Sequence, residues 1–572
     1  MLAIYYISVI SFYLSTKETM GPLLAIIAIF VICAAFTIFS LLSSSERGLG
    51  DDYYEMNGKA SSENYRDTTV AYSLQVAVTA YFVYWGFAYG LANWIFIASW
   101  FAGFGLFALA SRRLAYSVKK HNSLIDLIST NGVVKRVLSL ILVASFSGLI
   151  YAELFFSSGF LAHLMGMVNN GLTYSVCFWL SFICLSGVVV LYVSSGGVKR
   201  VLQTDGVQLG LAYIGFSMFS LSISPYVYEM SSHSFWWLYG FQSFLMFVIS
   251  CAGKMPFFGA DKAIPNRSSM SEKFAKASVI ILLVALCVPY LFNLSTHGIA
   301  FSQIIPGPMS LFHEKYGIWA IMSFGLANIV WQFSDYTAFH RLRLIASGEE
   351  VSNPETLIKR NIFLTSISSP ITWGMGIALG MLFRVAVNAS QSADLSLVGL
   401  IDCCILNDQF GTMMQVVGAV GLSIFIASIM MSTVDSTFLV ISQMVERDCM
   451  QRSISSKSKS IILVIVAAIV IGFSIIQLLL HVDILSKLSF IYSLSLTFSA
   501  PVIYALLGWK LSGSKTAIAI IISSAASFAS LCMHSSMPEL VSMVLPQMVG
   551  IVLSFILVPL LNWHGIPKKE ED

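Results

Sequence analysis

Residues 425–439, with the sequence FIASIMMSTVDSTFL, place polar side chains inside a strongly apolar segment. The polar members include the adjacent hydroxyls of Ser432 and Thr433 and the carboxylate of Asp435. Polar groups at membrane depth are costly to bury and are retained where something polar is held or passed. Two hydroxyl oxygens suit a small hard cation such as Na⁺. The alternative is that each hydroxyl bonds back to the carbonyl four residues earlier, as in many membrane helices.

The composition is that of an integral membrane protein and excludes a soluble one. Apolar residues make up 57% and charged residues 11% of the 572 residues, and the mean hydropathy is +0.80. Apolar segments long enough to cross roughly 30 Å of hydrocarbon recur along the chain. We predict an all-α polytopic membrane protein in one integral membrane domain, with about 15 transmembrane helices. The segments are 21–43, 68–87, 90–111, 137–166, 172–194, 204–226, 235–253, 277–297, 316–339, 361–387, 411–441, 460–480, 486–509, 515–533 and 540–562.

The sequence lacks the usual features of an enzyme. No polar insertion is long enough to form a soluble catalytic domain, and no two His residues stand at a spacing typical of metal ligands. The Cys residues form neither a disulfide framework nor a CxxC metal site. We therefore expect a protein that is not an enzyme and that uses no metal ion other than sodium.

Basic residues are distributed unevenly between alternate loops. All but four of the 32 Lys and Arg residues fall in every second loop or its flanks. The exceptions are Lys17, Lys315, Arg384 and Lys487. Because cytoplasmic loops carry an excess of basic residues, this bias predicts an N-terminus outside and a C-terminus inside the cell.

Four short strings stand in an order that is typical of one transporter family. They are NYR and AYSL within residues 64–74, SSGGVKRVLQTDGVQ at 194–208, SDYTAFHR at 334–341 and STVDS at 432–436. These strings resemble, respectively, the approach to the first core helix, a glycine turn followed by TDxxQ, the end of the sixth core helix, and a motif of the eighth. Together they make residues 21–510 similar to the sodium:solute symporter family.

This resemblance implies a leucine-transporter-like fold. Such folds contain two five-helix repeats of inverted topology, in which the first and sixth core helices are broken near the midplane. The first repeat would be 68–226 and the second 316–510, with accessory helices at 21–43 and 515–562. An additional helix pair within 235–297 departs from the family pattern. The function of this pair is not readable from the sequence.

The resemblance also implies a sodium site between the first and eighth core helices. Carried over residue by residue, the family pattern assigns backbone carbonyls to Val76, Thr79 and Ile429 and hydroxyls to Ser432 and Thr433. An opened helix exposes carbonyls that cannot remain unpaired in lipid, so an ion is a natural partner for them.

Five further residues are candidates for the substrate site or a gate. Asn328 and Trp331 match substrate-facing positions of the sixth core helix, and Phe155 matches one of the third. Glu153 is a carboxylate deep inside a span. Three roles are expected for it: a proton acceptor, a partner for a cationic substrate, or a group that is hydrogen-bonded to its neighbours. Asp205 is either an inner-gate or ion-exit contact or a structural cap or salt bridge.

The sequence therefore predicts a sodium-coupled symporter that imports a small organic solute by alternating access across a plasma or inner membrane. The alternatives are a proton-coupled or ion-independent transporter of the same fold and a non-transporting membrane sensor. Positions that are polar in sugar transporters of the family are apolar here, which argues against a sugar as the solute. An amine or quaternary ammonium solute would fit the aromatic residues through cation–π contact. Small carboxylates are the alternative class of solute. We expect the lipid bilayer as a partner and no nucleic acid; the oligomeric state stays open.

Overall fold

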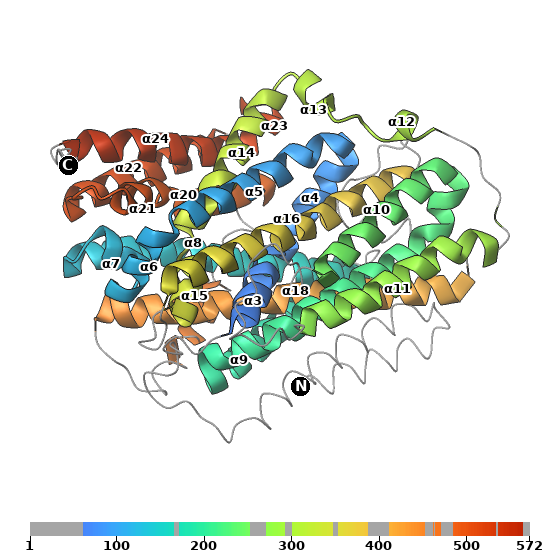
Figure 1. Ribbon diagram of the computed structural model, residues 1–572, viewed down its shortest axis with the longest axis horizontal. Coiled ribbons are helices and arrows are strands. Elements are labelled where there is room, and N and C mark those ends of the chain that lie inside the picture. The colour runs from blue at the N-terminus through green and yellow to red at the C-terminus, as the bar shows by residue number, and fades with distance from the viewer. Residues whose placement is uncertain are drawn as a thin grey trace.

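The computed structural model forms a bundle of long helices (Figure 1). It describes residues 61–164, 171–251, 270–291, 294, 300–346, 353–386, 411–451, 461–462, 464–470, 484–533 and 536–563. Within these ranges the chain is helical and contains no β-strand. The predicted accessory helix at 21–43 and most of the predicted span at 460–480 lie outside the described residues.

Nine of the described helices are long and apolar enough to cross a membrane. These segments confirm the prediction of an all-α polytopic membrane protein, whereas the total number of spans and the sidedness of the termini stay predictions. The segments are Val76–Leu109, Gly132–His163, Gly197–Met230, Ser232–Cys251, Ser271–Leu291, Pro354–Val385, Met414–Met450, Lys487–Leu506 and Gly513–Cys532. Two shorter apolar helices are Ser175–Leu191 and Leu545–Leu561.

The first long apolar region is preceded by a break in the helix. Helix α3 spans Ser62–Ser73 and helix α4 spans Val76–Tyr89. Between them, Gln75 has φ −5° and ψ 137°, which is incompatible with a continuous α-helix. The predicted span at 68–87 therefore consists of two half-helices.

A second break separates helix α14, Gly317–Ser334, from helix α15, Tyr336–Ala346. Asp335 at this break has the extended values φ −78° and ψ 106°, and its carboxylate accepts a 2.8 Å hydrogen bond from the Thr337 N–H. A carboxylate that caps the first turn stabilises the start of α15. The two breaks lie in the first helix of each predicted repeat, while the division into repeats stays a prediction.

The remaining helices surround these two broken ones. They are η3 (Gly90–Asn93), α5 (Trp94–Leu109), α6 (Ser111–Lys120), α7 (Leu124–Ile128), α8 (Gly132–Leu164), α9 (Gly171–Met230), α10 (Ser232–Cys251), α11 (Met270–Leu291), α12 (Phe301–Ile304), α13 (Ser310–His313), α16 (Pro354–Ala386), α18 (Gly411–Met444), η7 (Val445–Met450), α20 (Ile484–Leu496), α21 (Ser499–Leu506), α22 (Gly513–Cys532), α23 (Glu539–Ser542) and α24 (Leu545–Leu561). Helix α9 is bent at Gly197, which has φ 57°, a value that glycine adopts without strain. This bend falls in the predicted glycine turn.

Glycines bring α4 and α16 into direct backbone contact. A Cβ atom at Gly86 would lie 2.3 Å from the Ile377 carbonyl oxygen, and one at Gly380 would lie 2.1 Å from the Val83 carbonyl oxygen. Because neither position has room for a side chain, small residues let the two helices approach closely, as is common in membrane bundles. This contact fixes α4, the second half of the first broken helix.

The additional helix pair, α10 and α11, lies at one side of the bundle, away from the C-terminal helices α22 and α24 (Figure 1). Helix α11 packs along α9 and also contacts α3. The Arg66 guanidinium of α3 lies 2.8 Å from the Glu272 carboxylate of α11, and both side chains are buried. The Ser271 hydroxyl of α11 donates a 2.7 Å hydrogen bond to Asp67 of α3. Helix α11 of this pair therefore holds α3, the first half of the broken helix.

Candidate ion and solute site

Glu153 of α8 binds the backbone at the start of α4. Its fully buried carboxylate accepts hydrogen bonds from the Val76 N–H at 2.7 Å and the Ala77 N–H at 3.0 Å. The first N–H groups of a helix lack intrahelical acceptors and carry a partial positive charge, so a carboxylate is a favourable partner. Of the roles expected for Glu153, the structure shows hydrogen bonding to its surroundings, although the partners are backbone groups.

The carbonyls at the same break are also bound by side chains. The Trp373 indole N–H of α16 donates to the Ser73 carbonyl at 2.8 Å, and the Thr79 hydroxyl donates to the Leu74 carbonyl at 2.8 Å. Buried peptide groups need such partners because they lose their hydrogen bonds to water. Side chains from α4, α8 and α16 therefore stabilise the opened turn between α3 and α4.

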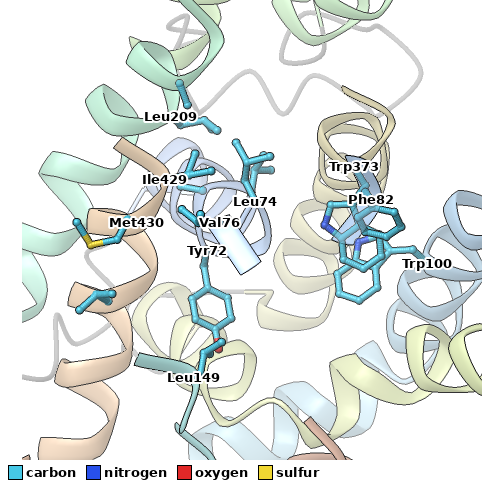
Figure 2. Close-up of a cluster of buried hydrophobic side chains, with 14 of the residues drawn as sticks. Tyr72, Leu74, Val76, Phe82, Trp100, Leu149, Leu209, Trp373, Ile429 and Met430 are labelled. Atoms are coloured by element: carbon cyan, nitrogen blue, oxygen red, sulfur yellow. The ribbon is translucent and has the colours of Figure 1, made fainter. Parts of the chain in front are cut away.

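Three of the predicted sodium ligands lie together on one small cavity. Val76, Thr79 and Ile429 line this cavity between α4, α9, α16 and α18, where the other lining side chains are apolar. Figure 2 shows Val76 and Ile429 side by side in the buried core. The break in α3–α4 and the middle of α18 therefore meet, as the proposed ion site requires.

The two predicted hydroxyl ligands follow Ile429 by one helical turn and make different hydrogen bonds. Thr433 donates to the Ile429 carbonyl at 3.1 Å, which is the back-bonding arrangement considered as the alternative. Ser432 donates instead to the Asp205 carboxylate of α9 at 2.6 Å. The Thr68 hydroxyl of α3 donates to the other oxygen of Asp205. Asp205 thus joins α3, α9 and α18 through two buried hydroxyls.

A larger cavity of about 90 Å³ lies on another side of α4; we call it the aromatic cavity. Its lining residues come from the α3–α4 break and from α5, α14, α16, α20 and the region around the start of α24. They are Tyr72, Ser73, Gln75, Ala77, Val78, Tyr81, Phe82, Trp100, Phe324, Ala327, Asn328, Trp331, Trp373, Leu488, Ser489, Tyr492, Leu496, Met543 and Gln547. Figure 2 shows three of the aromatic side chains, Phe82, Trp100 and Trp373, packed against one another.

The structure separates the predicted substrate residues into two groups. Asn328 and Trp331 line the aromatic cavity, whereas Phe155, Glu153 and Asp205 are not among its lining residues. The Asn328 side-chain N–H₂ donates to the Phe96 carbonyl at 3.2 Å, which orients its amide. Phe155 instead packs against other aromatic rings of α8 and α9.

Sequence reasoning missed several residues of this cavity. Gln75 lies in the break itself, and its side-chain oxygen accepts a 2.7 Å hydrogen bond from the Tyr492 hydroxyl of α20. Trp373 contributes both a wall and the hydrogen bond to the break. The aromatic run at 81–85 was the available signal, but no motif in the chain links it to Tyr492 or to Gln547.

Arg341 of α15 lies close to the same break. Its guanidinium stands over the Tyr72 ring, 4.4 Å from the ring centre, and donates to the Thr337 hydroxyl at 2.9 Å and the Ser436 hydroxyl at 3.3 Å. A guanidinium over an aromatic face is attracted by the ring quadrupole. Arg341 therefore ties both broken helices to α18.

Comparison with known proteins identifies the fold. No protein-family model and no curated protein matches this chain. Among solved structures, it is similar to a Na⁺-coupled sialic acid symporter in a substrate-bound, outward-open state, with a TM-score of 0.60 and 15% sequence identity. The match covers 94% of this chain and 98% of that chain. The chain therefore has a sodium:solute symporter-like fold, as its four sequence motifs predicted.

Proposed function

We propose that this protein is a Na⁺-coupled symporter that moves a small organic solute across its membrane. One observation carries the proposal: the first turn of α4 borders two cavities. Val76 and Thr79 line the small cavity with Ile429 of α18, while Ala77 and Val78, which lie between them in the chain, line the aromatic cavity. An ion bound on one side of this turn would therefore influence a solute bound on the other.

The available ligands suit Na⁺. The carbonyls of Val76, Thr79 and Ile429 and the hydroxyls of Ser432 and Thr433 are all oxygen atoms, which Na⁺ prefers over nitrogen or sulfur. Asp205 bonds to Ser432 at 2.6 Å and would add a negative charge beside the ion. Among the residues that the structure describes, no group of three or more His, Cys, Asp or Glu side chains could hold another metal ion.

Coupling follows from the position of the shared turn. Na⁺ would hold α4 against α18 and complete the solute site, and movement of the repeats would then release both on the other side. One Na⁺ crossing about 100 mV gains about 2.3 kcal/mol. A tenfold concentration gradient adds about 1.4 kcal/mol. Together these support solute accumulation of several hundredfold, and we place the protein in a plasma or inner membrane.

Glu153 was the candidate for a proton-coupled alternative. Because its carboxylate accepts two backbone hydrogen bonds at the start of α4, we assign it to positioning that turn. We therefore favour Na⁺ as the coupling ion.

The ion site is tested with Na⁺ itself, since the solute is unidentified. Purified protein would be titrated with NaCl against KCl while tryptophan emission and thermal unfolding are followed. We expect Na⁺ to stabilise the protein and Ser432→Ala and Thr433→Ala each to weaken Na⁺ affinity about tenfold, the loss of roughly one charge-assisted contact. The control is Ser423→Ala, a buried α18 hydroxyl that bonds back to the Ala419 carbonyl at 2.7 Å.

Two results would contradict the proposal. Unchanged Na⁺ affinity in the Ser432→Ala/Thr433→Ala double variant would reject the ion site. Equal responses to Na⁺ and K⁺ in the unaltered protein would reject Na⁺ coupling altogether.

A further inference from the structure

The aromatic cavity contains no charged side chain among the described residues that line it. Three charged residues of the described chain neighbour it. Glu153 binds the backbone N–H of Ala77, Lys487 precedes Leu488, and the Arg341 guanidinium lies over the Tyr72 ring. None of the three lines the cavity. A buried charge on a ligand is very costly unless an opposite charge or several hydrogen bonds compensate it. The lining therefore favours a solute without net charge.

The lining includes buried polar groups that lack hydrogen-bond partners among the described residues. Ser489 is 2% exposed and Gln547 is 4% exposed, and neither the Ser489 hydroxyl nor the Gln547 side-chain oxygen has a hydrogen-bond partner in the described part of the chain. Gln75, held through its oxygen by Tyr492, has an N–H₂ group left to donate. Unpaired buried polar groups are destabilising, so the cavity suits a ligand that provides both donors and acceptors.

This pattern argues against a quaternary ammonium, which the aromatic residues alone would favour. Such a cation is attracted to ring faces, but it has neither N–H nor carbonyl groups to pair with Ser489, Gln75 and Gln547. An uncharged amide has both.

The walls of the cavity favour a flat ligand. The Trp100 and Trp373 rings lie 3.9 Å apart between their centres, and Phe82 lies 4.8 Å from Trp373. Across the cavity lining, Trp331 meets Tyr492 edge to face at 5.4 Å. Aromatic side chains of this kind stack on planar heterocycles, because every such ring presents a π-face.

We propose that the solute is an uncharged, planar heterocycle that carries a cyclic or primary amide, the chemistry of a nucleobase or a nicotinamide. This inference rests on the proposed transport function, because it assigns the solute to the aromatic cavity. Its ring lies against the tryptophans, and its amide edge pairs with Gln75, Ser489 and Gln547.

Binding to purified protein tests this class by charge. Nicotinamide, nicotinate and 1-methylnicotinamide share one ring and are neutral, anionic and cationic, and uracil and hypoxanthine extend the neutral set. Quenching of tryptophan emission would be measured for each at saturating Na⁺. We expect at least one neutral compound to bind, and nicotinamide to bind at least about tenfold more tightly than either charged analogue. Preference for either charged analogue, or binding of none of the neutral compounds, would overturn the proposal.

Variants locate the binding to this cavity. Ser489→Ala removes one of the unpaired groups and is expected to weaken neutral-ligand affinity about tenfold. Gln547→Glu adds a carboxylate and is expected to shift the preference toward 1-methylnicotinamide. The matched control is Gln303→Glu, an exposed glutamine that does not line the cavity. Full neutral-ligand affinity in both cavity variants would place the ligand elsewhere and overturn the proposal.

The outcome is separable from the test of transport. Ligand binding in detergent requires no gradient, so a charged-ligand preference overturns the solute class while the Na⁺ response stands. Equal responses to Na⁺ and K⁺ would reject Na⁺ coupling, while the measured preference for neutral ligands would still stand.

Discussion

Replacing Glu153 with Gln tests how the broken helix is held. The carboxylate binds the N–H groups of Val76 and Ala77 at 2.7 and 3.0 Å, and the site is fully buried. The amide of Gln keeps one acceptor oxygen but presents an N–H₂ group to the other backbone N–H. One hydrogen bond is lost, and the backbone N–H and the amide N–H₂ face each other as unpaired buried donors, which we expect to cost about 2–4 kcal/mol.

The assay is unfolding of the purified protein, followed by tryptophan emission under heat or denaturant. Glu153→Gln should lower the unfolding temperature, and Glu153→Ala, which removes both acceptors, should lower it roughly twice as far. Na⁺ affinity should fall as well, because the Val76 and Thr79 carbonyls depend on the position of the same turn. The control is Glu355→Gln in the exposed first turn of α16, where the change should be below about 1 kcal/mol.

A proton-carrying role for Glu153 predicts a different pattern. In that case Gln, which mimics the protonated carboxyl group, would keep the stability and abolish the pH dependence of uptake. Glu153→Gln with unfolding within about 0.5 kcal/mol of the unaltered protein would refute the positioning role argued from the structure.

Two further predictions concern packing. Arg66→Ala breaks its buried ion pair with Glu272 and should destabilise the protein by about 3–5 kcal/mol, whereas Arg66→Met combined with Glu272→Leu should recover most of the loss in the same unfolding assay. If the double variant recovers none of the lost stability, the Arg66–Glu272 ion pair is not the link between α3 and α11. Gly86→Ala places a Cβ atom 2.3 Å from the Ile377 carbonyl oxygen and should cost at least about 1–3 kcal/mol, while Gly105→Ala, with no atom within 4 Å of its Cβ, should be nearly neutral. Equal yields and unfolding temperatures for the two alanine variants would contradict the close contact of α4 with α16.

Hydropathy predicted the nine long apolar helices of the described residues and placed the start of the first core helix too late. The predicted span began at residue 68, whereas α3 begins at Ser62. The additional turn contains Arg66 and Asp67, which are buried because Glu272 and Ser271 of α11 bind them. A window of hydropathy counts such residues as polar, since the groups that bind them are some 200 residues away in the chain.

Residues of the candidate site could be predicted from the sequence only where they lie in or next to a recognisable motif. The strings at 71–74 and 432–436 placed Val76 and Ile429 in one region, and these two residues line the same cavity. No such motif marks most of the residues that line the aromatic cavity. Tyr492 and Gln547 reach it from helices that enter the bundle late in the chain, and the bond of Tyr492 to Gln75 depends on how whole helices pack.

Ser432 and Thr433 of α18 were interpreted either as cation ligands or as hydroxyls bonded to protein acceptors, and the two interpretations are compatible. Thr433 gives its proton to the Ile429 carbonyl and Ser432 gives its proton to Asp205. A hydroxyl has one proton and two lone pairs, so donation to a protein acceptor leaves the oxygen free to face a cation. Likewise, Trp373, Thr79 and Glu153 keep the opened turn in place through side-chain hydrogen bonds. In the proposed mechanism, Na⁺ does not need to hold the break open. Its binding energy would remain available to draw α4 and α18 together and so to couple the ion to the solute.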